Sequence, residues 1–155
     1  MEAFEDDSVI AEAKQTGVDP AEEMIGFIQE MRDYATARNP NFIILQQNAA
    51  SLIDGHPELA NVIDALAQEA IWFDGDADVD WGSSDGYDDP NDQALVDYYL
   101  EYLWEYQDAD LPVFDCEYAL EHAAKAYTNA YGEDFIPYAT RRSLSQLTTT
   151  PPPGY

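Results

Sequence analysis

A glutamate stands inside an apolar run of this sequence. The run is ALAQEAIWFDG, residues 65–75, and it would make an ordinary buried strand if Glu69 were not within it. A carboxylate is costly to bury without a partner, so we expect Glu69 to face a polar cleft. A semi-apolar setting beside Ile71 and Trp72 would raise its pKa toward neutrality, which suits a general acid. The alternative is a carboxylate that is only solvated at the rim of the fold.

The other apolar runs also turn polar toward their C-terminal ends. They are NFIILQQN (41–48), LPVFDCEY (111–118) and DFIPYAT (134–140). Their polar residues are Gln46, Gln47, Asn48, Asp115, Glu117 and Thr140. In parallel α/β folds the carboxyl ends of the strands carry the ligand site, so these positions are candidates for binding.

Helical patterns alternate with these runs. The segment 18–40 has Asp19 as N-cap, Pro20 in the first turn and Glu22 at the capping-box position. Apolar residues then recur at helical spacing at Met24, Phe27, Ile28, Met31 and Tyr34. Further helices are predicted at 56–66, from 89–90 to 106, and at 119–132. Near-continuous apolar strands between helices predict an α/β fold with parallel strands covered by helices.

The chain is strongly acidic but has the composition of a folded protein. It has 32 Asp and Glu against 6 Lys and Arg, a net charge of −26, with 46% hydrophobic residues and eleven tyrosines. Such a surface repels nucleic acid and anionic lipid and favours cationic partners, and adaptation to high salt explains it best. We therefore expect no nucleic-acid and no membrane partner. The acidic N-terminus has the wrong sign for a secretory signal.

Other motifs fail on spacing. The acidic loop 74–92 has alternating aspartates, but a calcium-binding loop needs glycine at its sixth position, where Val79 or Trp81 stands. The histidines His56 and His122 and the single Cys116 make no metal-ligand pattern. We expect no metal and no cofactor. The segment TTTPPPGY at the end of the chain is predicted to be a disordered tail, with the domain over residues 1–147 and the tail over 148–155.

Several stretches together resemble the endo-α-1,4-polygalactosaminidase-like proteins, family 114 of the glycoside hydrolases. The matching pieces are MIGFIQEMRDYATARNPNFIILQQNAASLI, IDALAQEAIWF, VFDCEY and FIPYATRRSL, in this order over roughly residues 20–147. The resemblance implies the C-terminal half of a (β/α)8 TIM barrel. It also implies an extracellular enzyme that hydrolyses α-1,4-linked galactosamine polymers with one aspartate and one glutamate.

The resemblance assigns the glutamate to Glu69 as the catalytic residue. The aspartate would end the strand before a stretch like EAFEDD, so we expect this chain to lack it, together with the first half of the barrel. The alternative for Glu69 is a rim carboxylate paired with Arg141 or Arg142. Activity of the isolated chain is therefore an open question at this stage.

The remaining candidates would bind a cationic amino-sugar polysaccharide, and each has a structural alternative. Amides at Gln47 and Asn48 would hydrogen-bond sugar hydroxyls, or would cap the next helix. Acidic side chains at Asp115 and Glu117 would bind the amino group, or would only hydrate the rim. The aromatic candidates are Trp72, Tyr118 and Tyr138, which could stack on sugar or pack within the fold.

A second hypothesis is a non-catalytic half-barrel, or a carbohydrate-binding or interaction module. Four strand–helix units leave open parallel edges and an apolar inner face, which drive pairing. Two copies could close an eight-stranded barrel as a homodimer. An acidic structural protein without a ligand is the third hypothesis, and it does not explain why polar groups gather at the strand ends.

Overall fold

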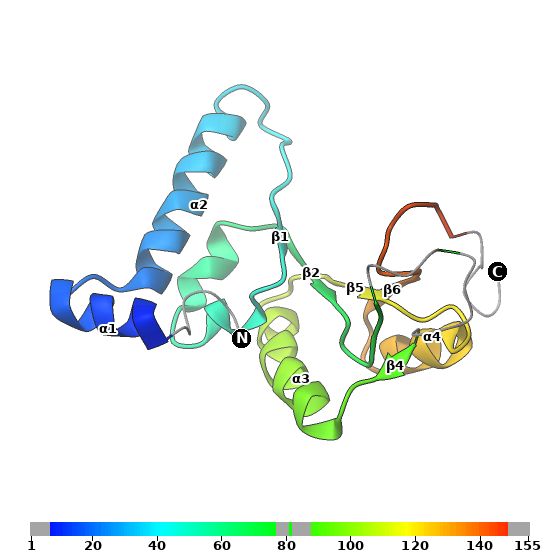
Figure 1. Ribbon diagram of the computed structural model, residues 1–155. Coiled ribbons are helices and arrows are strands. Elements are labelled where there is room, and N and C mark those ends of the chain that lie inside the picture. The colour runs from blue at the N-terminus through cyan, green and yellow to red at the C-terminus, as the bar shows by residue number, and fades with distance from the viewer. Residues whose placement is uncertain (1–6, 77–80, 82–87, 149–155) are drawn as a thin grey trace.

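The computed structural model describes residues 7–76, 81 and 88–148 (Figure 1). Its helices are α1 (Asp7–Thr16), α2 (Pro20–Thr36), α3 (Gln93–Asp108) and α4 (Ala123–Gly132), with short 3-10 helices η2 (Ala50–Ile53) and η3 (Pro57–Asn61). Its strands are β1 (Leu45–Gln47), β2 (Ala65–Glu69), β3 (Phe73–Asp74), β4 (Asp89–Pro90), β5 (Val113–Glu117) and β6 (Ile136–Ala139). Strand and helical segments alternate from β1 onward, as the sequence predicts.

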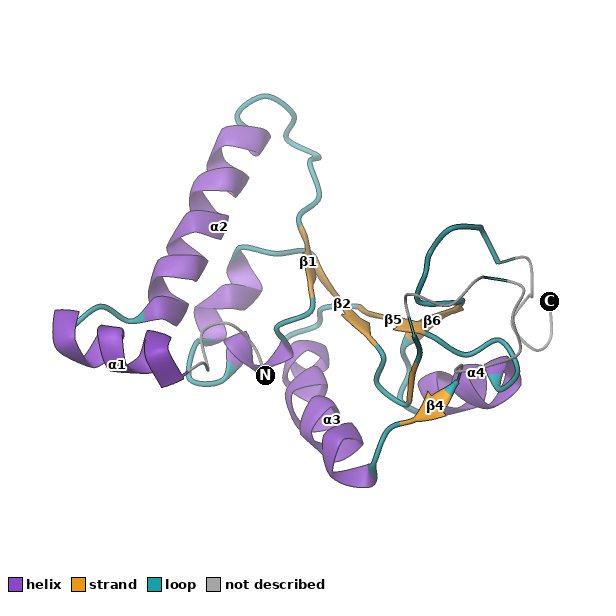
Figure 2. Ribbon diagram, viewed as in Figure 1, coloured by secondary structure: helices purple, strands orange, loops and turns teal. Residues whose placement is uncertain are grey.

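Four of these strands form one parallel sheet in the order β1-β2-β5-β6. Chain neighbours are sheet neighbours in this order, apart from the short antiparallel pair β3–β4 inserted after β2. Helices α3 and α4 lie on the same side of the sheet (Figure 2). Connections of this kind bring the carboxyl ends of all four strands to one edge.

The sheet has one covered face and one open face. On the covered face Leu66 and Val113 are almost fully buried in the main core, which α3 also joins through Leu103 and Tyr106. On the opposite face the side chains remain accessible. Those residues are Leu45, Phe114, Ile136 and Tyr138, with exposed fractions between 36% and 47%. Side chains alternate along a strand, so this open apolar face is the counterpart of the packed one.

Helix caps fix where two of the helices begin. Asp19 accepts a hydrogen bond from the Ala21 backbone N–H at 2.9 Å, which confirms the predicted N-cap of α2. Asp92 caps α3 by accepting from the Leu95 N–H at 2.9 Å. The third helix therefore begins at residue 93, after the predicted Asp89-Pro90 start, because that dipeptide is strand β4.

The apolar stripe predicted for α2 is divided between core and surface. Ile28 is buried with the neighbouring Ile25. The remaining stripe residues, Met24, Phe27, Met31 and Tyr34, are between 41% and 65% exposed. Helix α1, which the sequence did not predict, contacts α2 without covering this stripe. Helix α2 therefore keeps an apolar face exposed.

The predicted helix at 56–66 is wrong. Its first half forms η3, and its last residues enter β2. The cause is Asp64, whose carboxylate accepts from the Ile44 backbone N–H at 2.7 Å and from the Arg32 guanidinium at 2.9 and 3.0 Å. These contacts hold Asp64 at the start of a strand, where a helix cannot continue.

The strand predicted over 65–75 is shorter than expected, because β2 ends at Glu69 and the chain turns at Ala70. Most of the acidic loop and the end of the predicted tail, residues 77–80, 82–87 and 149–155, lie outside the described residues. Within the described part of the chain, no helix has the length and apolar character needed to span a membrane.

Candidate active site

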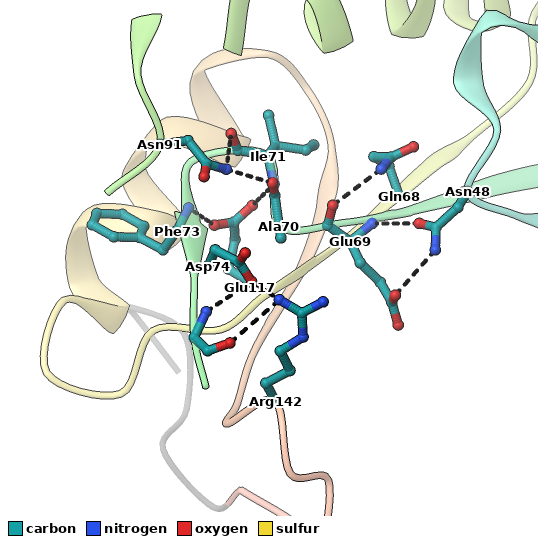
Figure 3. A network of polar contacts seen from close by, with 11 residues as sticks. Asn48, Gln68, Glu69, Ala70, Ile71, Phe73, Asp74, Asn91, Glu117 and Arg142 are labelled. Carbon is teal, nitrogen blue, oxygen red and sulfur yellow. Dashed lines mark hydrogen bonds and ion pairs between the residues drawn. The ribbon is translucent and has the colours of Figure 1, made fainter. Parts of the chain in front are cut away.

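The carboxylate of Glu69 lies at the carboxyl end of β2, where three side chains converge on it. The Gln47 amide donates to Oε1 at 2.6 Å, and the Asn48 amide donates to Oε2 at 3.0 Å. The hydroxyl of Tyr118 also hydrogen-bonds this carboxylate. Glu69 is therefore an acceptor in each of these contacts, and Figure 3 shows Asn48 directed at it.

These partners come from the neighbouring strands on either side of β2. Gln47 is the last residue of β1 and Asn48 follows it, while Tyr118 follows β5. The register aligns Gln47 with Ala67 and Glu69 with Cys116, so the parallel pairing sets all of them at one edge. Burial raises the pKa of the Tyr118 hydroxyl, and the Glu69 carboxylate raises it further, so Tyr118 keeps its proton and donates.

Backbone conformations at this edge are unusual. Asn48, Ala49 and Ala70 have φ angles of 57°, 58° and 52°, in the left-handed region that residues other than glycine seldom adopt. Such conformations persist only where the surrounding structure fixes them, and they gather at functional sites. Here Gln46 donates its amide to the carbonyls of Asn48 and Ala49, both at 2.9 Å.

An ion pair also lies among the residues around this site. Arg142 forms an ion pair with Asp74, and its guanidinium also donates to the Gly75 carbonyl at 3.3 Å. The same guanidinium lies 5.7 Å from the ring centroid of Tyr118. Arg142 is therefore engaged by Asp74, which answers the alternative in which Arg142 was the partner of Glu69.

These side chains line an open cavity of about 400 Å³. The residues around it are Gln47, Asn48, Ala49, Gln68, Glu69, Ala70, Asp74, Asn91, Leu95, Tyr99, Tyr118 and Arg142. They combine amide, carboxylate and phenol groups with a few apolar side chains. Such a lining can hydrogen-bond several hydroxyl or amino groups of one ligand while an aromatic ring packs beside it.

Two of the predicted acidic ligands are not among the residues that line this cavity. Asp115 and Glu117 are each 1% exposed and point to the covered side of β5. Glu117 accepts backbone N–H groups of Ile71, Trp72 and Phe73, at distances between 2.7 and 3.2 Å. Neither side chain can contact a sugar directly, because both are buried inside the fold.

The aromatic candidates are separated as well. The Trp72 ring packs against Phe135, with centroids 6.2 Å apart, and lines a different cavity together with Lys125. Tyr138 lies on the open face, beside Cys116 in the register of β5 and β6, and its hydroxyl accepts from the Thr148 N–H at 3.1 Å. Of the three predicted aromatic residues, Tyr118 is the one that contacts Glu69.

The semi-apolar setting expected for Glu69 is also corrected. Ile71 is fully buried in the core, and the backbone N–H groups of Ile71 and Trp72 are directed at Glu117. The cause is the turn at Ala70, which takes the chain away from the cavity immediately after Glu69. Amide donors surround the carboxylate where apolar side chains were expected.

Sequence reasoning missed Asn91, which holds the turn after Glu69. Its side-chain amide donates to the carbonyls of Ala70 and Ile71, at 2.7 and 3.1 Å (Figure 3). Its backbone N–H donates to the Trp72 carbonyl at 2.9 Å. No local signal marks this residue, because its partners are about twenty positions earlier in the chain.

No group of His, Cys, Asp and Glu side chains among the described residues has the arrangement of a metal site. The thiol of Cys116, beside Glu69 in the register, is held protonated. Burial raises its pKa to about 12, with smaller contributions from the charges of Glu69 and Glu117. The cavity presents carboxyl, amide, phenol and guanidinium groups.

The chain is similar to known proteins in sequence and in fold. No protein-family model matches the sequence. A Deinococcus radiodurans protein of uncharacterized function is 32% identical over 132 residues, which are 84% of this chain and 39% of that protein. The structure resembles the glycoside hydrolase domain of PelA from Pseudomonas aeruginosa with a TM-score of 0.62, at 18% identity over 82% of this chain and 47% of that one.

A variant of the same PelA domain, in which one glutamate is replaced by alanine, matches with a TM-score of 0.61 at 17% identity. The likeness confirms the predicted fold class, an α/β fold of parallel strands corresponding to half of a TIM barrel. The chain spans about two fifths of the Deinococcus protein and about half of the PelA domain.

Proposed function

We propose that this chain is part of a glycoside hydrolase barrel that cleaves α-1,4-linked galactosamine polysaccharide, with Glu69 as one of its two catalytic carboxyl groups. The observation that carries the proposal is the setting of Glu69. It ends an inner strand of a parallel sheet, opens onto a cavity, and accepts hydrogen bonds from Gln47, Asn48 and Tyr118.

The contacts of Glu69 favour a particular role within a carboxyl pair. Glycoside hydrolysis needs an acid that protonates the leaving oxygen, and a second carboxylate that acts as nucleophile or base. All of the contacts of Glu69 named above are with donors, so it is oriented as an acceptor. We therefore assign it the nucleophile or base role, and we assign the role of partner acid to the aspartate that the family resemblance implies.

The charge of the chain supports a cationic amino sugar as substrate. Glu69 and Asp74 both line the cavity, and Arg142, the arginine among its lining residues, is paired with Asp74. The chain as a whole carries a net charge of −26. A strongly negative surface raises the local concentration of a polycation and speeds its encounter with the site.

The test is binding of a galactosamine oligosaccharide by wild type and by Glu69→Gln, measured by calorimetry, with turnover assayed by release of reducing ends in the full barrel that supplies the partner acid. We expect the variant to keep its far-UV circular dichroism and to bind about tenfold more weakly or worse, because a charged acceptor is lost, and we expect the full barrel that carries it to show no turnover. Glu30→Gln is the matched control, since Glu30 is an exposed residue of α2.

Equal binding by Glu69→Gln and wild type, or equal turnover by the full barrels that carry them, would refute the proposal. Repeating the titration with uncharged galactose oligomers tests the amino-sugar part separately. Affinity for the amino sugar should fall as salt is added, while affinity for the uncharged sugar should stay level.

A second candidate is a non-catalytic half-barrel that pairs with a second copy of itself. Apolar residues on the open sheet face favour it, as does the lack of a strand partner for the outer edges of β1 and β6 within the described residues. Two such sheets together supply the eight strands of a closed barrel. The sedimentation coefficient tests this pairing, since a monomer at all concentrations up to about 100 µM, far above the Kd of a stable dimer, excludes it.

A further inference from the structure

The turn that follows Glu69 is held by a single buried carboxylate. Oε1 of Glu117 accepts the N–H of Ile71 at 2.7 Å and of Trp72 at 3.1 Å. Its Oε2 accepts the N–H of Trp72 at 3.2 Å and of Phe73 at 2.7 Å. Three consecutive backbone donors therefore converge on one side chain, which Figure 3 shows beneath the turn.

The carbonyl side of the same turn is also held by distant groups. Asn91 donates its amide to the carbonyls of Ala70 and Ile71. The N–H of Ala70 itself donates to the Cys116 carbonyl at 3.0 Å. These contacts hold Ala70 in its left-handed conformation, and Ala70 is covalently joined to Glu69. Any shift of the turn therefore moves the backbone from which the Glu69 side chain projects.

A second buried acid explains how Glu117 keeps its acceptor role. Asp115 shares a hydrogen bond with Glu117. No other N–H or O–H group among the described residues donates to the oxygens of Asp115. Burial raises the pKa of Asp115 well above its ordinary range, and the negative charge of Glu117 raises it further. Burial also raises the pKa of Glu117, but hydrogen bonds from Asp115 and from the backbone oppose that change. Both oxygens of Glu117 accept backbone N–H groups whereas those of Asp115 accept none, so the shared proton is assigned to Asp115 and Glu117 accepts.

We propose that Glu117 is a positioning residue for Glu69, with Asp115 as the proton donor that keeps Glu117 in its acceptor state. The carboxylate of Glu117 fixes the backbone of residues 70–73, and this backbone sets the place of Glu69 in the cavity. The effect on ligand binding rests on the proposed function, whereas the effect on the turn does not.

The test compares three variants of the full 155-residue chain. Glu117→Gln presents an N–H₂ group to the turn where an acceptor is needed. Asp115→Asn keeps a donor toward Glu117. Asp64→Asn is the stability control, because Asp64 also accepts a backbone N–H but precedes the opposite end of β2. Amide hydrogen exchange, far-UV circular dichroism and affinity for a galactosamine oligosaccharide are measured for each.

We expect Glu117→Gln to speed exchange at residues 71–73 by about tenfold or more and to weaken ligand affinity by about tenfold, because buried donors lose their partner. Asp115→Asn should retain wild-type exchange and affinity. Asp64→Asn should lose stability but keep ligand affinity. A purely structural role would give equal losses of affinity for Glu117→Gln and Asp64→Asn, and that result would overturn the proposal.

Two further outcomes keep the proposal testable. If Glu117→Gln does not fold, wild-type exchange decides, because the amides of Ile71 and Phe73 must then exchange far more slowly than exposed amides. Rapid exchange there would overturn the anchoring role. If wild type binds no amino sugar, the proposed function fails, while the exchange data still report on the anchoring of the turn.

Discussion

Asn48 combines two roles whose energies can be separated. Its amide donates to Glu69 Oε2 at 3.0 Å, and its side-chain oxygen accepts the Glu69 backbone N–H at 3.0 Å. Its own φ of 57° is left-handed, which asparagine and glycine tolerate better than alanine. Replacing it by glycine removes the side-chain contacts alone, whereas replacing it by alanine also strains the backbone.

The magnitudes follow from these contacts. A hydrogen bond to a charged group contributes about 1.5 kcal/mol and a neutral one about 0.5 kcal/mol at the low ends of their ranges, which suit these half-buried groups. Asn48→Gly should therefore lower the free energy of unfolding by about 2 kcal/mol. The left-handed penalty for alanine adds about 1 kcal/mol, so Asn48→Ala should lose about 3 kcal/mol.

Urea denaturation at equilibrium measures both variants, and calorimetry with a galactosamine oligosaccharide measures the site. A difference of about 1 kcal/mol corresponds to a shift of roughly 2–4 °C in Tm for a chain of this length. Both variants should weaken ligand binding equally, because both lose the contacts to Glu69.

Asp110 provides the matched control for backbone strain. Its φ is 61°, its side chain is exposed, and it lies ahead of β5 at the opposite end of the sheet from Glu69. Asp110→Gly and Asp110→Ala should differ in stability by the same amount as the Asn48 pair, with ligand affinity unchanged. Equal stabilities of Asn48→Gly and Asn48→Ala would refute the left-handed turn, and wild-type stability of Asn48→Gly would refute the contacts.

Two remaining predictions concern pH and salt. The hydrogen bond from Arg32 lowers the pKa of Asp64, so its contribution to stability is complete above the unfolded value of about 3.9 and is lost as pH falls through the lower folded value. Acid denaturation of Asp64→Asn should therefore lack this loss, and a profile identical to wild type would contradict the assignment. If two copies pair, the dimer should strengthen with salt, since each copy carries −26, and sedimentation at rising salt should show it.

The general fold could be predicted from the sequence because its signals are local. Apolar runs alternate with helical patterns, and these patterns predict strands that are parallel and covered by helices. Element boundaries depended on contacts between distant residues. Asp64 turned a predicted helix into the start of β2 by bonding Arg32 and Ile44, and Ala70 ended that strand early.

Part of the site could also be predicted, since Gln47, Asn48 and Tyr118 all contact Glu69. The error at Glu117 has a definite physical cause. Alternation along β5 directs Glu117 to the covered face, while Cys116 faces the open side. An acidic residue is not expected on the covered face, because a buried carboxylate is costly without hydrogen-bond partners. The backbone donors that make it stable there belong to a turn more than forty residues earlier, which no pattern reveals.

These observations separate two layers around Glu69. Gln47, Asn48 and Tyr118 touch the carboxylate itself, whereas Glu117 and Asn91 hold the backbone that follows it. In the outer layer Glu117 is buried and Asn91 is half-buried, and their carboxylate and amide groups fix a left-handed residue. Because strained turns need such support, a buried acid at a strand end is explained by the backbone it holds. A carboxylate that faces an open cavity, with only side-chain donors on its oxygens, is the one available to a ligand.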